Sequence, residues 1–326
     1  MIWEILKAIL LGLVEGITEW LPISSTGHMI IVNQFVQLDV STGFLDLFLI
    51  VIQLGAILAV IVLYFRRLNP FSRQKTALQR RATWRLWLKV LGASIPAAIL
   101  GLLLDDWVTA HLFNAVVVAL ALMVYGVAFI LVERLKSERE PLVEPSTRRR
   151  PAAAARRSGE ELVSPATNRH FREASSSEAR ELNSPAASWQ AEDLPWPRAI
   201  GIGCFQVLAI IPGTSRSGST ILGGRLLGVS RQTAAEFSFF LAIPVMFGWS
   251  LIKVLKTLVL EQLAVSATEW MLLGVGVLVA FLVSLAAIRF LISFIQRHSF
   301  AAFGWYRIIL GVVVLAYFAL SGQLLG

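Results

Sequence analysis

Six long runs of apolar residues divide the chain, and each is long enough to form a membrane-spanning helix. A helix that crosses the hydrocarbon core of a bilayer needs about 20 mainly apolar residues. The six runs are Phe44–Phe65, Trp87–Leu104, Ala115–Val132, Phe237–Leu258, Trp270–Phe290 and Gly304–Ala319. The pattern therefore predicts an all-α integral membrane protein with six transmembrane helices.

Two further apolar stretches, about Ile2–Phe35 and Ala199–Gly228, are each interrupted by a polar cluster. The clusters are Pro22–His28 and Pro212–Thr220, which are rich in Ser, Thr and Gly. Irregular backbone at membrane depth is tolerated only where it is buried in protein or lines a cavity. We therefore expect each stretch to fold as a re-entrant pair of half-helices, with its polar cluster at the break.

The spacing of these features predicts an inverted-topology repeat. Pro22 precedes Asp46 by 24 residues, and Pro212 precedes Glu236 by the same 24 residues. Each interval leads from a hydroxyl-rich break to a full span, and each half then contains three spans. Because three is odd, the second half begins on the opposite side of the membrane. The alternative is a coincidence of spacing, because Ser and Gly are common at helix breaks. Repeats of this kind place functional sites where broken helices meet.

The repeat divides the chain into three parts: a first repeat at 1–135, an insert at 136–197 and a second repeat at 198–326. The insert is rich in Ala, Ser, Pro, Arg and Glu and has few large apolar residues, so it lacks the material for a core. We expect it to be a disordered cytoplasmic linker. Contact between its Arg clusters and anionic lipid is the alternative.

Composition and charge agree with a membrane protein and indicate its orientation. The 326 residues are 56% hydrophobic with a mean hydropathy of +0.70, above the 45–50% apolar content that is usual for soluble domains. The stretch 66–85 holds seven Lys or Arg and no acid, which predicts a cytoplasmic loop. Both termini then fall outside. A net charge of +8 carried by such loops argues against nucleic-acid binding, and the single cysteine, Cys204, excludes an internal disulfide.

Two carboxylates precede the first break. Glu15 and Glu19 are four residues apart, so on a helix they share one face. Two such groups can hold a hard divalent cation, or act as a base and the group that orients it. The alternative is a pair of acids at the membrane interface or capping a half-helix. Because ionisable groups inside a membrane are costly, we favour a functional role.

The first cluster combines hydroxyls with an imidazole. Ser24, Ser25 and Thr26 follow a proline, a position typical of a helix N-cap, and helix N-termini also favour anions. His28 comes three residues after Ser25, about one helical turn on. It could be the base for a serine nucleophile, or the nucleophile itself. A structural histidine is the alternative.

The second cluster contains one cation, Arg216, among hydroxyls and glycines. A guanidinium in apolar surroundings needs an anion, and phosphate matches its geometry. The alternative is an ion pair with Glu15, Glu19 or Glu236. We favour phosphate. The side chains and backbone groups that we expect to bind phosphate beside Arg216 are those of Ser24, Thr26, Gly213, Thr214, Ser215, Ser217, Gly218 and Thr220.

Both clusters resemble signatures of a known family. Glu15–His28 is similar to the first motif of the bacterial undecaprenyl-diphosphate phosphatases, also called bacitracin resistance proteins, and Pro212–Thr220 resembles their second motif. The stretches Phe44–Leu63 and Gly228–Phe239 are also similar to the family. The similarity covers nearly the whole chain except about 137–195, which looks longer than is usual.

The resemblance implies hydrolysis of undecaprenyl diphosphate to undecaprenyl phosphate in the bacterial plasma membrane, with a site open to the outer face. It implies that Glu19, Ser25, His28 and Arg216 are catalytic, with Glu15 less important because the family admits Glu or Gln there. It also implies a divalent cation, Mg²⁺ or Ca²⁺, which Glu15 and Glu19 would hold. We expect Ser25 to attack with His28 as its base, and a phosphohistidine at His28 is the alternative. Membrane lipids would be the remaining partners.

A transporter or lipid flippase for an anionic substrate is the rival interpretation. Inverted repeats with broken helices are common in carriers. The set of Glu, Ser, His and Arg side chains is richer than a binding site needs, and this favours an enzyme.

Overall fold

The computed structural model describes residues 1–137 and 190–321, and the secondary structure of this part consists of helices joined by turns and loops, without strands. Six of its helices are long and apolar enough to cross a membrane. They are α3 (Thr42–Leu63), α5 (Ala77–Leu112), α6 (Ala115–Ser137), α10 (Arg231–Leu255), α11 (Ala267–Ile295) and α12 (Ala301–Leu320). The prediction of six spans in an all-α membrane protein is confirmed.

Several spans are longer than their apolar runs, because capping groups set where they begin. Helix α5 begins after Thr76, whose side chain and that of Gln79 form a capping box. Helix α11 begins after Ser266, which forms the same arrangement with Glu269. Such reciprocal bonds satisfy backbone N–H groups that a helix start leaves free. The polar first turns are therefore helical although hydropathy alone does not mark them.

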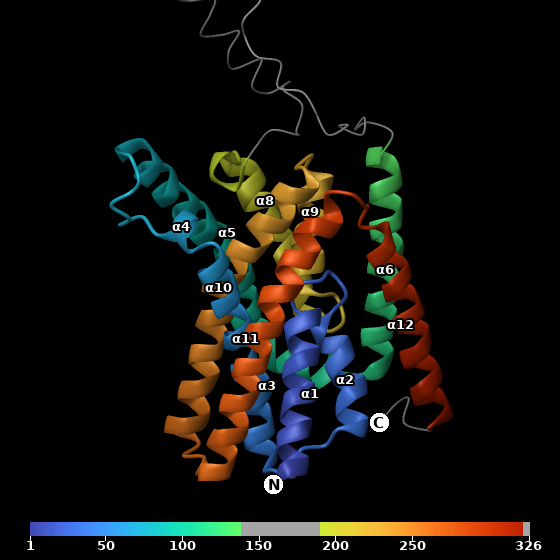
Figure 1. Ribbon diagram of the computed structural model, residues 1–326. Coiled ribbons are helices and arrows are strands. Elements are labelled where there is room, and N and C mark those ends of the chain that lie inside the picture. Colours follow the sequence, from blue (N-terminus) through green and yellow to red (C-terminus); the bar gives the residue numbers. More distant parts are fainter. Residues whose placement is uncertain (138–189, 322–326) are drawn as a thin grey trace, which may run out of the picture.

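The two interrupted stretches each form a pair of short helices. The first pair is α1 (Ile2–Thr18) and α2 (Ser25–Phe35). The second is α8 (Trp196–Gln206) and α9 (Arg216–Leu226), with the 3₁₀ turn η3 (Val207–Ile210) between them. Figure 1 shows α1 and α2 in the lower half of the molecule and α8 and α9 in the upper half. The polar turns of both pairs therefore lie in the interior, between the six long helices.

The two polar turns share an unusual backbone geometry at the serine that caps the returning helix. Ser24 has φ 74° and accepts a hydrogen bond from the Gly27 amide. Ser215 has φ 72° and accepts one from the Gly218 amide. Positive φ is unfavourable for residues other than glycine, and it persists only where the surroundings hold it. Each turn is thus held in a defined shape by its own cap and by its neighbours.

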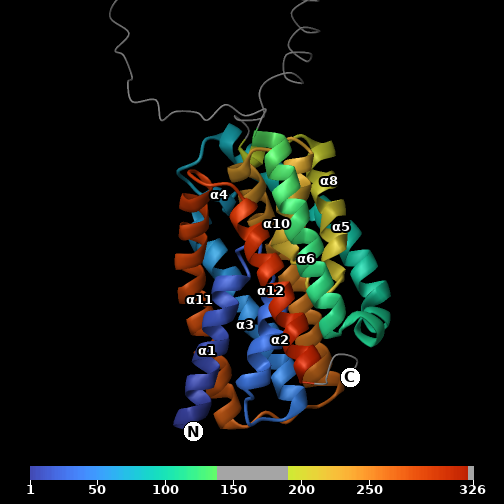
Figure 2. The ribbon, with the colours of Figure 1, turned by 90° about the vertical axis from the view of Figure 1, so that its right-hand side faces the viewer.

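Close helix crossings join the two halves of the chain. Helices α6 and α12 lie side by side in Figure 2, and they touch at Gly126 and Gly304. A Cβ added to Gly126 would lie 2.7 Å from the Gly304 carbonyl oxygen, and one added to Gly304 would lie 2.6 Å from that of Gly126. Small residues allow this approach in membrane proteins, where helix packing depends on close backbone contact.

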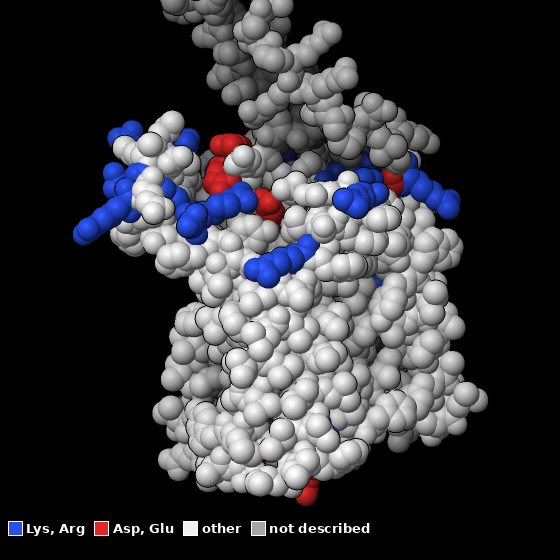
Figure 3. All heavy atoms as spheres, in the orientation of Figure 1, with Lys and Arg blue, Asp and Glu red and all other residues white. Residues whose placement is uncertain are grey.

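Charged side chains gather at one end of the molecule. Figure 3 shows Lys and Arg concentrated near the top of the view, whereas α1 begins and α12 ends near the bottom in Figure 1. The predicted insert falls outside the described residues over 138–189. At its edges, α6 continues to Ser137, and the chain resumes with the 3₁₀ turn η2 (Ala191–Asp193) before α8.

An ion cluster ties η2 to the helices beneath it. Arg67, in the short helix α4 (Phe65–Leu68), donates to both carboxylate oxygens of Glu192 at 2.8 and 2.6 Å, and to Glu236 at 2.8 Å. Lys89 donates to the Glu192 carbonyl at 2.9 Å. Burial alone would raise the pKa of Glu192, but the hydrogen bonds from Arg67 hold it below its ordinary value. Glu236 is thus occupied with Arg67 and does not reach Arg216.

Candidate active site

The two polar turns meet through direct side-chain contacts. The Arg216 guanidinium donates from Nη2 to Glu19 Oε1 at 2.9 Å and from Nη1 to the Ser238 carbonyl at 2.8 Å. Ser217 donates to the carbonyls of Glu19 and Leu21 at 3.1 and 3.3 Å. The first predicted site cluster therefore touches the second, although nearly 200 residues separate them in sequence. Among the acids weighed as partners of Arg216, Glu19 makes the ion pair.

Glu19 also receives the hydroxyl of Ser25, whose Oγ lies 2.7 Å from Glu19 Oε2. One carboxylate oxygen thus accepts from the serine and the other from the arginine. A carboxylate within hydrogen-bonding distance of a hydroxyl can accept its proton when the oxygen attacks. The arrangement places the hydroxyl of Ser25 and the guanidinium of Arg216 on the same carboxylate.

His28 is turned away from Ser25. Its Nδ1 lies 2.7 Å from the Ser24 carbonyl, and its Nε2 lies 2.7 Å from the hydroxyl of Tyr306 on α12. The two rings are also stacked, with centroids 5.6 Å apart. Because a carbonyl only accepts, Nδ1 carries a proton, and Nε2 of the neutral ring accepts from Tyr306. His28 therefore does not form the expected hydrogen bond with Ser25, because its Nε2 is bonded to Tyr306 from a distant helix.

Glu15 lies behind Glu19 on α1 and is 1% exposed. Its Oε1 is buried without a hydrogen-bond partner. No group of three or more His, Cys, Asp or Glu side chains forms a complete metal site within 1–137 and 190–321. Mg²⁺ is often bound by only one or two carboxylates together with phosphate oxygens and water. The carboxylates of Glu15 and Glu19 fit a cation whose remaining coordination positions are filled by oxygens of a phosphorylated ligand and by water.

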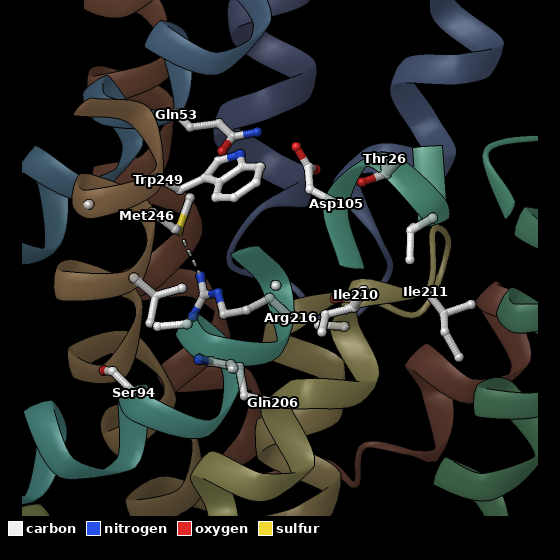
Figure 4. A pocket seen from close by; sticks show the side chains of 18 of the residues that line it. Thr26, Gln53, Ser94, Asp105, Gln206, Ile210, Ile211, Arg216, Met246 and Trp249 are labelled. Atoms are coloured by element: carbon white, nitrogen blue, oxygen red, sulfur yellow. Dashed lines mark hydrogen bonds between the residues drawn. The ribbon is translucent and has the colours of Figure 1, made fainter. Parts of the chain in front are cut away.

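A cavity of about 430 Å³ opens beside this cluster. Glu19, Ser25 and Arg216 line it. Residues of α5, α8 and α10 complete the lining, among them Ser94, Gln206 and Met246, which Figure 4 labels. Its apolar wall includes Leu102, Val108, Met246, Trp249 and Ile252, and its further polar groups are Gln53, Ser94, Asp105 and Gln206. A site with a few charged groups beside a long apolar wall suits a molecule with a polar head and an apolar body.

The predicted phosphate-binding residues separate into three groups. Thr26, Gly213 and Ser215 line the cavity. Those with structural contacts instead are Ser24 and Gly218, in the caps, and Ser217 and Thr220, whose hydroxyls bond within and between the turns. Thr214 is fully buried, and its hydroxyl has no partner. Most of the second cluster therefore builds the turn that presents Arg216.

Arg307 was not singled out by the sequence patterns, yet it holds both turns. It is fully buried on α12 and donates to the Pro22 carbonyl at 3.2 Å, and to the carbonyls of Gly213 and Thr214 at 3.0 and 2.7 Å. Its guanidinium also lies 5.5 Å from the centre of the Tyr125 ring. The signal was available, because an ionisable residue inside an apolar span usually has a specific role.

We expect Arg307→Met to destabilise the protein by about 3 kcal/mol or more, because each buried carbonyl left unpaired costs roughly 1–3 kcal/mol. The measurement is thermal unfolding of purified protein in detergent, read by loss of the monodisperse peak. Val312→Ala, an exposed position on the same helix, is the matched control. An unchanged midpoint for Arg307→Met would show that the turns are held without this residue.

Comparisons with known proteins identify the family of the chain. A family model described as bacitracin resistance protein BacA matches residues 8–159 and 167–313. A protein of Limosilactobacillus fermentum named undecaprenyl-diphosphatase is 49% identical over 97% of this chain and 98% of its own length. Proteins of the same name from Streptococcus thermophilus and Enterococcus faecalis are 48% and 44% identical, over 98% and 97% of this chain and 94% and 98% of their own lengths. These relatives align along nearly their whole length, so they share a segment comparable to the insert. The chain is a multi-pass membrane protein that belongs to the bacitracin resistance protein BacA family.

Proposed function

We propose that this protein is a membrane phosphatase that hydrolyses undecaprenyl diphosphate to undecaprenyl phosphate and phosphate. It would thereby recycle the lipid carrier of cell-wall synthesis and give resistance to bacitracin. The names of the relatives support the substrate. The observation that carries the proposal is the carboxylate of Glu19, which accepts from both Ser25 and Arg216 at the edge of the cavity.

In the first step, the terminal phosphate lies against Arg216, whose positive charge offsets the charge of the phosphoryl oxygens. Ser25 Oγ attacks the terminal phosphorus while its proton passes to Glu19 Oε2. The bond from that phosphorus to the bridging oxygen breaks, and undecaprenyl phosphate leaves with the bonding electrons. Glu19 is suited to be the base because it already accepts the Ser25 hydrogen bond. His28 positions the Ser24 carbonyl and thus the start of α2.

In the second step, water attacks the phosphoserine and the bond to Ser25 Oγ breaks. Glu19 returns to Ser25 Oγ the proton that it accepted in the first step, and both protons of the attacking water leave with the phosphate, which is released as H₂PO₄⁻. Glu15 and Glu19 would hold a divalent cation, Mg²⁺ or Ca²⁺, in company with phosphate oxygens. When bound, such a cation neutralises charge on the diphosphate. The unpaired Oε1 of Glu15 supports this assignment.

We further propose that α1–α2 and α8–α9 are re-entrant pairs of an inverted repeat. Two observations support it: the pairs occupy opposite halves of the molecule in Figure 1, and each returns at a serine with φ near 73° that caps the next helix. The concentration of Lys and Arg at one end supports a cytoplasmic position for that end. Asp105 and Val108 extend the cavity along α5 away from that end, which supports a site open to the outer face of the plasma membrane.

The experiment is phosphate release from undecaprenyl diphosphate by purified protein in detergent, with and without EDTA. We expect release that EDTA abolishes and that Mg²⁺ or Ca²⁺ restores. A rate of phosphate release that EDTA leaves unchanged would show that the reaction does not need the cation. No release from well-folded protein would overturn the phosphatase and favour the carrier, for which lipid translocation in vesicles is the assay.

A further inference from the structure

Gln206 combines burial with an unused hydrogen-bonding capacity. It is the last residue of α8, lines the cavity and is 2% exposed. Neither its amide nitrogen Nε2 nor its amide oxygen Oε1 has a hydrogen-bond partner in the protein. A buried amide without partners costs free energy, so natural proteins rarely keep one without a reason. A molecule that enters the cavity is a candidate for the missing partner of Gln206.

Arg216 lines the same cavity and also has a buried polar atom without a hydrogen-bond partner. Two of its nitrogens are bonded to Glu19 and to the Ser238 carbonyl, but Nε is buried and unpaired. Figure 4 shows the amide of Gln206 directed to the side of the cavity where the Arg216 guanidinium lies. An acceptor bound between Gln206 Nε2 and Arg216 Nε would satisfy both of these unpaired donors.

The remaining polar group on that part of the wall is already engaged. Ser94 lines the cavity, but its hydroxyl donates to the Val90 carbonyl at 2.8 Å. Ionised phosphate oxygens only accept, so they need free hydrogens. The Gln206 amide offers two such hydrogens. Because the amide is neutral, it does not compete with Arg216 for the ion pair with Glu19.

We infer that Gln206 is a substrate-binding residue, whose amide donates to a non-bridging oxygen of the diphosphate beside Arg216. This inference rests on the proposed function for the identity of the lipid. It adds a neutral hydrogen-bond donor to the charged groups of the site, Glu15, Glu19 and Arg216. The chain spacing fits this division of roles. Gln206 precedes the capping Ser215 by nine residues, as Glu15 precedes the capping Ser24. The two halves thus place a carboxylate and an amide at corresponding positions, the first suited to a cation and the second to an anion.

The test measures binding rather than turnover, with farnesyl methylenediphosphonate as a non-hydrolysable probe in isothermal titration of the detergent-purified protein. Gln206→Met keeps the volume and removes both polar atoms. We expect its Kd to rise about 10-fold or more, the usual effect of losing a hydrogen bond to a charged group. Ser94→Ala, on the same wall with its hydroxyl already used, should bind like the wild type. In turnover, KM should rise more than kcat falls.

An unchanged Kd for Gln206→Met would overturn the inference and show that water satisfies the amide. If that variant does not fold, Gln206→Ala serves, because its shorter side chain leaves space in a cavity that already admits water, and it should give the same rise. The two proposals fail separately. Probe binding that depends on Gln206, in a protein that releases no phosphate, would keep the inference and reject the phosphatase. Phosphate release by the wild type, together with probe binding that is unchanged in Gln206→Met, would keep the phosphatase and reject the inference.

Discussion

Replacing Arg216 by alanine is expected to lower phosphate release by about 10³-fold or more. The guanidinium and the proposed nucleophile, Ser25, both contact the carboxylate of Glu19. Arginines that offset charge in phosphoryl transfer are worth 10³–10⁵-fold in turnover, because their effect is greatest where charge accumulates in the transition state. The measurement is kcat for undecaprenyl diphosphate under saturating lipid and cation.

Two further variants make this result interpretable. Arg216→Lys keeps a charge but loses the forked geometry, so we expect an intermediate loss. Glu19→Gln should lose activity as severely, because the amide cannot take the Ser25 proton. Since Arg216→Ala leaves Glu19 buried without its partner, unfolding is measured in parallel. An Arg216→Ala protein that is folded and retains a tenth of wild-type turnover would contradict the assignment.

Ser25→Ala is expected to abolish turnover while leaving binding of the diphosphate probe within a few-fold of the wild type. Loss of a nucleophile removes the chemical step, whereas Arg216 and the other donors still hold the phosphate. The drop should reach about 10³-fold or more, limited by residual electrostatic stabilisation. This combination also separates an enzyme from a carrier, because a carrier would keep moving its substrate without the hydroxyl.

His28→Asn is the matched variant on the same helix. Asparagine can still donate to the Ser24 carbonyl but offers nothing to Tyr306, so we expect a loss of only about 10-fold. A His28→Asn protein as inactive as Ser25→Ala, with acid-labile phosphate trapped on His28 in the wild type, would reassign the nucleophile. Tyr306→Phe should resemble His28→Asn, because it removes the same hydrogen bond.

The spans and the breaks were predictable because they depend on local composition. Apolar runs of sufficient length mark helices in a bilayer, and a hydroxyl-rich interruption marks a turn wherever it occurs. The bounds were less predictable, since Thr76 and Ser266 extend α5 and α11 into polar sequence through their caps.

The residue types that meet at the cavity were predictable from the sequence, but their contacts were not. Spacing placed His28 one turn from Ser25, yet the ring direction depends on Tyr306, 278 residues away. Gln206 was missed because one amide near a helix end resembles an ordinary cap. Its significance lies in what it does not contact, which only a three-dimensional structure reveals.

The position of Arg307 has a consequence for biosynthesis. It lies in α12, which follows the other five spans of the described residues in the chain and is therefore synthesised after them. Its guanidinium joins the turn near Pro22 to the turn near Gly213. The nascent protein must therefore keep Glu15, Glu19 and Ser25 in the membrane through five earlier spans before their final support arrives. Activity should then appear only after insertion of α12, and a chain that stops before α12 should be an early substrate for membrane proteases.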